Sequence, residues 1–318
     1  MALPRSLVLG VAIFLSLLLL GAGGHYHKDK IQDAYSKQRE VWLATRRSRF
    51  KRVVSFGDSL SDAGNGAWLF THKTWPNDDL YIGHRFTDGP VHAEYVAQTL
   101  RVPLISYAVG GAAISYRVSS RSGAHAQQPV DCVIEQIKKY SVGKTDESDT
   151  LFILYAGAND AYNSLKEGGT PDEVTEDLKT AVKDLQKIGG QYIIVPTLPP
   201  LGDTYPYANV EPVAASAMHV FSTELRQQYL AWAKTESKVA IADFYTLFNR
   251  LMGEPEKYGF KREYLKDGCI SHHSRCKEHA REYIWFDDYH PTTYAHSLMA
   301  EVTLNALDEV LRPNHRVW

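Results

Sequence analysis

The residue types able to support chemistry in this sequence are a serine in its first quarter and an aspartate–histidine pair near its C-terminus. Ser59 follows a short β-branched and aromatic run, residues 53–56, and a Gly-Asp turn. His290 stands three residues after Asp287 and directly before a proline. A serine hydroxyl is a weak nucleophile until a base takes its proton, and imidazole suits that task near neutral pH. The pattern makes Ser59 a candidate nucleophile and His290 a candidate base whose imidazole Asp287 could orient. Taken alone, His290 could equally be a loop histidine that caps a helix and has no catalytic role.

Two glycine-bearing turns are candidates for binding a negatively charged oxygen. Gly110 and Asn159 each lie in a turn that follows a β-rich run. A glycine lets a backbone N–H approach a ligand closely, and an Asn side chain supplies an N–H₂ donor. Together with the N–H of Ser59, Gly110 and Asn159 are expected to form an oxyanion hole. Gly111 is adjacent to Gly110, so the donor within that turn is open between the two glycines.

The elements that must position these residues form an alternating pattern from Arg52 onward. Five short runs are apolar on both faces, as is typical of parallel strands covered on both sides: residues 53–56, 103–107, 151–155, 192–196 and 239–242. Helical patterns lie between and after them: residues 87–100, 127–140, 171–187, 212–234 and 291–311. This alternation predicts one α/β domain over residues 52–318, with three layers and a central parallel sheet of about five strands. Reacting groups in such sheets gather at the carboxyl ends of the strands.

Composition and charge restrict the classes of partner. The chain has 318 residues, of which 44% are hydrophobic and 23% charged, an ordinary globular composition. Its formal net charge of -2 provides no general attraction for nucleic acid or acidic lipid. We therefore expect no nucleic-acid partner.

The N-terminus has the pattern of a secretory leader over residues 1–24. Residues 6–24 carry no charge, Arg5 precedes them, and the stretch ends in Gly-Ala-Gly-Gly. A cleaved signal peptide and a secreted, extracellular protein are the first interpretation. The apolar run is also nearly long enough to span a bilayer and the basic residues follow it, so an uncleaved anchor in a single-pass membrane protein is the alternative. Residues 25–51 are polar and basic and are interpreted as a stalk or linker.

Three cysteines remain to be placed. Cys269 and Cys276 lie close together in a polar loop, and Cys132 is far from both. In an oxidising compartment a Cys269–Cys276 disulfide is the simplest pairing and leaves Cys132 free. Histidines in the same loop invite a zinc interpretation, but their spacing matches no standard zinc motif. We therefore expect neither a metal nor a cofactor.

Taken together, Ser59, Gly110, Asn159 and His290 occur in an order that resembles the GDSL, or SGNH, family of hydrolases. The resemblance covers roughly residues 52–311 and rests on four blocks: Gly57-Asp58-Ser59-Leu60, Gly110, Gly157-Ala158-Asn159-Asp160 and Asp287-Asp288-Tyr289-His290-Pro291-Thr292. It implies a flavodoxin-like sheet and ester hydrolysis through an acyl-enzyme. It also implies that the N–H groups of Ser59 and Gly110 and the side chain of Asn159 form the oxyanion hole.

The same resemblance suggests a substrate class. Residues 85–91 and 198–202 are similar to fungal carbohydrate esterases of the acetylesterase type, which implies small acyl esters, acetyl above all, on small molecules or carbohydrates. They are also similar to phospholipases of the thermolabile-haemolysin type, so a lipase or phospholipase is the alternative. A catalytically silent carbohydrate-binding protein on the same fold is a third hypothesis, which the complete set of site residues argues against. His92 departs from the family pattern and is expected at a solvent-facing helix position.

Overall fold

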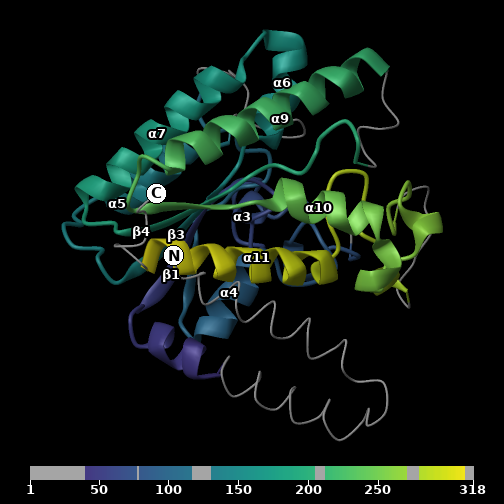
Figure 1. Cartoon of the computed structure of the whole chain (residues 1–318). Coiled ribbons are helices and arrows are strands. Elements are labelled where there is room, and N and C mark those ends of the chain that lie inside the picture. The colour runs from purple at the N-terminus through teal and green to yellow at the C-terminus, as the bar shows by residue number, and fades with distance from the viewer. Residues whose placement is uncertain (1–39, 77–78, 117–129, 205–211, 271–278, 312–318) are drawn as a thin grey trace, which may run out of the picture. The chain divides into compact units, whose positions relative to one another are not determined.

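The computed structural model describes residues 40–76, 79–116, 130–204, 212–270 and 279–311 (Figure 1). The chain divides into two units, residues 1–49 and 50–318. Within the first unit, residues 40–47 are helical. The second unit holds the sheet and every residue discussed below.

A single five-stranded sheet forms the centre of the second unit. Its strands are β1 (Arg52–Gly57), β2 (Leu104–Ser106), β3 (Thr150–Tyr155), β4 (Tyr192–Pro196) and β5 (Val239–Ala242). They are ordered β2-β1-β3-β4-β5, and every neighbouring pair is parallel. This is the flavodoxin-like order, so the predicted three-layer α/β fold with about five parallel strands is confirmed. All residues of β3, β4 and β5 are buried, as continuous apolar runs between two helical layers require.

Helices cover both faces of the sheet. One layer contains α4 (His92–Leu100) and α11 (Thr293–Leu311), which pack on each other and on the strands. The other contains α5 (Val133–Ser141), α7 (Pro171–Lys187) and α9 (Pro212–Ala233), with α7 packed between its neighbours (Figure 1). The shorter elements are α3 (Ala67–Phe70), α6 (Ala158–Glu167), α10 (Phe244–Gly253), η1 (Ile82–His84), η2 (Pro255–Tyr258), η3 (Arg262–Tyr264) and η5 (Ala280–Glu282).

Helix boundaries follow the capping chemistry of the chain. α7 has its predicted bounds because the Thr170 side chain accepts the Glu173 N–H while Glu173 reaches back to the Thr170 N–H. α4 begins later than predicted, at His92, because Glu94 accepts the Val91 N–H and caps the helix there. Helices α6 and α10, which begin within one or two residues of the end of a strand, were not predicted.

The structure contradicts the solvent-facing position expected for His92. Its side chain is fully buried beneath α4, with Nε2 3.2 Å from Ser61 Oγ and its ring edge-on to Tyr155 and Phe244. Burial disfavours the charged imidazole and lowers the pKa of His92 to about 3. The helix face that carries His92 therefore belongs to the core.

The predicted leader and the predicted disulfide fall partly or wholly outside the residues that the structure describes. None of the described helices is long and apolar enough to span a membrane, and the leader over residues 6–24 lies outside the described ranges. Cys132 is a free, buried thiol and Cys269 takes part in a disulfide. Cys276 lies outside the described residues, so its pairing with Cys269 stays a prediction.

Candidate active site

The structure brings Ser59, His290 and Asp287 into one hydrogen-bonded chain. His290 Nε2 lies 2.8 Å from Ser59 Oγ. His290 Nδ1 lies 2.8 Å from both carboxylate oxygens of Asp287. Ser59 stands just beyond the carboxyl end of β1, and the other two lie on the loop before α11. The side chains predicted to act as nucleophile, base and orienting residue are thus in direct contact.

Gly57 fixes the turn that presents Ser59. A Cβ at this position would lie 2.1 Å from the Tyr155 carbonyl oxygen, so only glycine allows β1 to approach β3 this closely here. The Gln136 side chain accepts the Gly57 N–H and donates to its carbonyl, both at 2.9 Å. The strand end is therefore held from β3 and from α5.

Asp287 is a buried carboxylate whose hydrogen-bonding capacity is well used. Its Oδ1 accepts the N–H groups of Tyr289 and His290, both at 2.7 Å, and its Oδ2 accepts the Tyr81 hydroxyl at 2.9 Å. Burial opposes ionisation, but the charge and hydrogen bond of His290, with the donors Tyr289 N–H and Tyr81, outweigh it and lower the pKa of Asp287. Asp287 is therefore ionised at neutral pH and can stabilise an imidazolium.

Asn159 and the Ser59 N–H are two of the donors predicted for an oxyanion hole. Asn159 is in the first turn of α6, and its amide donates to the Ala112 carbonyl at 3.0 Å and to Asp58 Oδ2 at 3.4 Å. These contacts orient the amide and join the ends of β1, β2 and β3. Within the described residues, no acceptor is hydrogen-bonded to the Ser59 N–H, which leaves it available for a substrate oxygen.

Asp62 is hydrogen-bonded to the turn that contains Gly110 and Gly111, the two glycines that could donate to the oxyanion. The Gly110 N–H donates to Asp62 Oδ2 at 3.0 Å, and a Cβ on Gly110 would lie 2.4 Å from the Phe86 ring. Gly110 is therefore required by packing, and its donor is engaged by a carboxylate rather than turned toward a ligand. Gly111 has φ 87°, a conformation that favours glycine. The assignment of the oxyanion donor to Gly110, with Gly111 as the alternative, stays a prediction.

Asp62 ties the segment after Ser59 to the Gly110 turn. Its Oδ1 accepts the N–H groups of Gly64 and Gly66 at 3.0 Å, and its Oδ2 accepts those of Ala67 at 2.7 Å and Gly110. Burial raises the pKa of Asp62, and these four donors act against that rise. Asp62 was not predicted from the sequence, although glycines two and four positions after an aspartate indicate a loop whose N–H groups bind the aspartate side chain.

Two more buried carboxyls flank Asn159 and were also missed. Asp58 accepts the Leu60 N–H at 3.0 Å, and Asp160 accepts the Ile114 N–H at 3.1 Å on each oxygen. Burial raises the pKa of each to about 7, although the backbone donors oppose the shift, as does the charge of His290 at Asp58. Both residues fix turns at the carboxyl end of the sheet.

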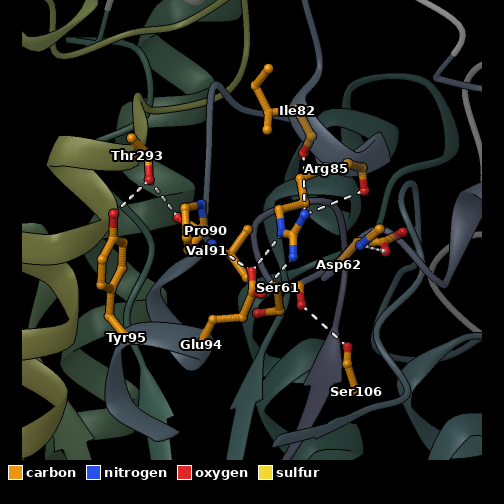
Figure 2. Close-up of polar contacts among 12 residues, drawn as sticks. Ser61, Asp62, Ile82, Arg85, Pro90, Val91, Glu94, Tyr95, Ser106 and Thr293 are labelled. Atoms are coloured by element: carbon orange, nitrogen blue, oxygen red, sulfur yellow. Dashed lines mark hydrogen bonds and ion pairs between the residues drawn. The ribbon is translucent and has the colours of Figure 1, made fainter. Parts of the chain in front are cut away.

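The segment before α4 supports the His290 loop. The Phe86 ring packs 5.0 Å from the His290 ring, centroid to centroid, and Thr87 Oγ1 donates to the Pro291 carbonyl at 2.9 Å. Asp88 accepts the Thr293 N–H at 2.7 Å and so caps α11. Figure 2 shows Thr293 between Pro90 and Tyr95, and Arg85 paired with Glu94.

No metal site accompanies these residues in the part of the chain that the structure describes. No group of three or more His, Cys, Asp or Glu side chains there is arranged to hold an ion. The loop of the disfavoured zinc interpretation lies largely outside the described residues, which omit 271–278.

A flavodoxin-like sheet with a serine, a histidine and an aspartate in hydrogen-bonded order at its carboxyl edge defines a serine hydrolase. The family model described as GDSL-like Lipase/Acylhydrolase matches residues 53–303, and the chain belongs to this family. The chain is accordingly a carboxylic ester hydrolase.

Three relatives from different organisms share most of the chain. A thermolabile hemolysin of Vibrio parahaemolyticus is 28% identical over 295 residues, which cover 86% of this chain and 68% of the relative. A GDSL esterase/lipase of Arabidopsis thaliana is 25% identical over 339 residues, covering 81% of this chain and 85% of the relative. A phosphatidylcholine-sterol acyltransferase of Aeromonas hydrophila is 26% identical over 228 residues, covering 69% of this chain and 66% of the relative.

Proposed function

We propose that the protein hydrolyses small acyl esters through an acyl-enzyme on Ser59. The observation that carries this proposal is the 2.8 Å contact between His290 Nε2 and Ser59 Oγ, with Asp287 at 2.8 Å from the other ring nitrogen. As Ser59 Oγ bonds to the ester carbonyl carbon, its proton passes to His290 Nε2. The tetrahedral intermediate then expels the alcohol, which takes that proton.

The second half of the cycle repeats the first with water. His290 removes a proton from water, the resulting hydroxide bonds to the acyl carbon, and Ser59 leaves with the proton returned by His290. The carboxylic acid is released and the free enzyme is restored. In both halves Asp287 stays ionised and stabilises the imidazolium that forms.

The negative oxygen of each tetrahedral intermediate requires donors that are in place beforehand. The Ser59 N–H, the Asn159 amide and an N–H of the Gly110-Gly111 turn are the groups we assign to it. Donors fixed by the protein reorganise little as charge develops, which is why such sites stabilise transition states strongly. The 3.0 Å contact of Asn159 with Ala112 supplies that rigidity, and the oxyanion takes the amide hydrogen that otherwise makes the longer 3.4 Å contact with Asp58.

We propose acetyl and other short acyl groups, carried by small molecules or carbohydrates, as the substrate class. This choice is supported by the similarity of residues 85–91 and 198–202 to acetylesterase-type members of the family. In the structure, residues 85–91 also contact the His290 loop, through the Phe86 ring and the Thr87 hydroxyl.

A phospholipase or lipase is the second candidate. It is supported by the names of two relatives, the thermolabile hemolysin and the phosphatidylcholine-sterol acyltransferase. Ile82, which directly follows the Tyr81 that contacts Asp287, is also a large apolar side chain that is 52% exposed. Exposed apolar groups beside a hydrolytic site suit contact with a lipid surface.

A chain-length series of p-nitrophenyl esters tests both candidates. We expect kcat/KM to be highest for the acetate and to fall toward the decanoate, and Ser59→Ala to abolish turnover of every ester. Turnover retained by Ser59→Ala would overturn the acyl-enzyme mechanism. A preference for the decanoate would instead establish the lipase alternative and leave the mechanism intact.

We also propose entry into the secretory pathway through residues 1–24, with cleavage near Gly-Ala-Gly-Gly. The free Cys132 and the disulfide at Cys269 are compatible with an oxidising compartment. Sequencing the N-terminus of the mature protein tests this. A start near residue 25 is expected, whereas an intact leader in a membrane fraction would establish the anchored alternative.

A further inference from the structure

Tyr81 reaches the aspartate of the triad from a distant part of the chain. Its hydroxyl donates to Asp287 Oδ2 at 2.9 Å across 206 positions of sequence. The residue directly precedes η1 and has an extended backbone. No motif of the sequence drew attention to it.

The other donors to Asp287 come from its own loop. Tyr289 N–H and His290 N–H both bind Oδ1, and the His290 ring faces both oxygens. Among the described residues, Tyr81 is thus the side chain from another segment that fixes the second oxygen. A carboxylate with donors on both oxygens cannot rotate about its Cβ–Cγ bond without losing one of them.

The Tyr81 ring is held by aromatic neighbours that also contact the triad. It packs edge-on to Phe286 at 5.5 Å and to Phe86 at 6.2 Å between ring centroids. Phe86 in turn packs on the His290 ring. The hydroxyl is therefore aimed by the same side chains that surround the imidazole.

The segment that carries Tyr81 is anchored on both sides of the site. Arg85 makes two hydrogen bonds of 2.7 Å to the carboxylate of Glu94 on α4, as Figure 2 shows. Thr87 and Asp88 bind the backbone of Pro291 and Thr293. This partly buried ion pair and the buried Phe86 ring hold the segment against α4 and the His290 loop.

We propose that Tyr81 is a positioning residue for the Asp287–His290 pair, holding the carboxylate in the plane that meets His290 Nδ1. This inference rests on the proposed function of Ser59, His290 and Asp287. The effect of Tyr81 is exerted through the orientation and charge of Asp287.

Tyr81→Phe tests the inference because it removes the hydroxyl and keeps the ring contacts. Loss of one hydrogen bond to a charged group is expected to lower kcat about tenfold while KM changes little. With Oδ2 less neutralised, the carboxylate attracts the imidazolium more strongly. We therefore expect the acid limb of the pH profile of kcat/KM to move toward higher pH.

The other titratable groups that face His290 do not confound this profile. Asp58 lies at the end of β1 and His296 on α11, and both interact electrostatically with His290. The described hydrogen bonds of Asp58 and His296 are made with Asn159 and with the His92 N–H, and neither residue is altered by the substitution. A shift of the acid limb in Tyr81→Phe therefore reports on Asp287.

Tyr294→Phe is the matched control. It removes a phenol on α11 that donates to the Tyr258 carbonyl at 2.8 Å. Among the described residues, its ring contacts Phe260 and Arg281 and not the triad. We expect wild-type kcat and an unshifted pH profile. Thermal denaturation of both variants establishes that they are folded.

A double-mutant cycle with Asp287→Ala separates positioning from general packing. Once Asp287 is absent, Tyr81→Phe should cause no further loss of turnover. Equal losses in both backgrounds, or wild-type kcat and pH profile in Tyr81→Phe, would overturn the inference while leaving an active wild-type enzyme. An inactive wild-type enzyme would instead contradict the proposed function itself.

Discussion

The site residues that could be predicted from the sequence lie in local motifs, whereas those that could not depend on contacts with distant parts of the chain. Ser59, His290 and Asp287 lie in short local patterns, so spacing alone brought them forward. Asp62 and Tyr81 work through partners 48 and 206 positions away, and no local pattern contains both ends of such contacts. Chemistry-bearing motifs were therefore predictable, whereas the side chains that hold them in place were not.

Replacement of Asn159 should lower turnover. Asn159→Ala removes the only side-chain donor assigned to the oxyanion hole and leaves the triad in place. Loss of one such donor is expected to lower kcat about a hundredfold with KM nearly unchanged, because the negative oxygen exists only along the reaction path. Steady-state kinetics on p-nitrophenyl acetate measures it. A rise in KM with kcat preserved would show that Asn159 binds substrate instead.

Among elements, the five strands were predictable because each is a short apolar run between turns. α6 was missed because Gly157, Asn159 and Asp160 are typical turn residues, although packing of α6 on α9 stabilises a helix there. α10 was missed because Asp243 alone separates it from β5, where its side chain caps the helix by accepting the Thr246 N–H. Packing therefore outweighed local propensity in α6, and the one-residue connection to β5 concealed the start of α10.

The loop after β1 should depend on Asp62 for its stability. Asp62→Asn replaces an oxygen that accepts two N–H groups with an N–H₂ group that can accept none. Leaving two buried donors unpaired should lower the free energy of unfolding by about 3 kcal/mol and also reduce kcat, because the Gly110 turn is released.

Urea denaturation and turnover together check this expectation. Glu176→Gln is the control, since it breaks an exposed ion pair with Lys179 and should change the free energy of unfolding by less than about 1 kcal/mol. Wild-type stability in Asp62→Asn would show that the four N–H contacts do not hold the loop.

At the scale of the whole molecule, buried titratable groups link stability to pH in opposite directions. The pKa of His92 is lowered by burial to about 3, so the unfolded chain binds a proton that the folded chain rejects, and stability is lost as pH falls below about 6.5. The pKa of Asp160 is raised by burial to about 7, so its contribution is full at low pH and is lost as pH rises through 7. The two effects oppose each other between pH 4 and 6.5, roughly.

His92→Gln isolates one side of this balance. Between pH 7.5 and 5.0 the wild-type protein should lose about 2 kcal/mol more of its free energy of unfolding than the variant, because only the wild type must keep His92 uncharged. Urea denaturation at the two pH values measures the difference. Equal losses in both proteins would mean that His92 is not a buried neutral imidazole.

The loops at the carboxyl edge of the sheet converge on one reactive hydroxyl, that of Ser59. A fluorophosphonate probe bonds covalently to a serine only when a base activates it, and mass spectrometry of the labelled protein locates the adduct. We predict a single adduct on Ser59 in the wild-type protein and none in Ser59→Ala. An adduct on another serine such as Ser61, or none in protein that hydrolyses esters, would contradict the account.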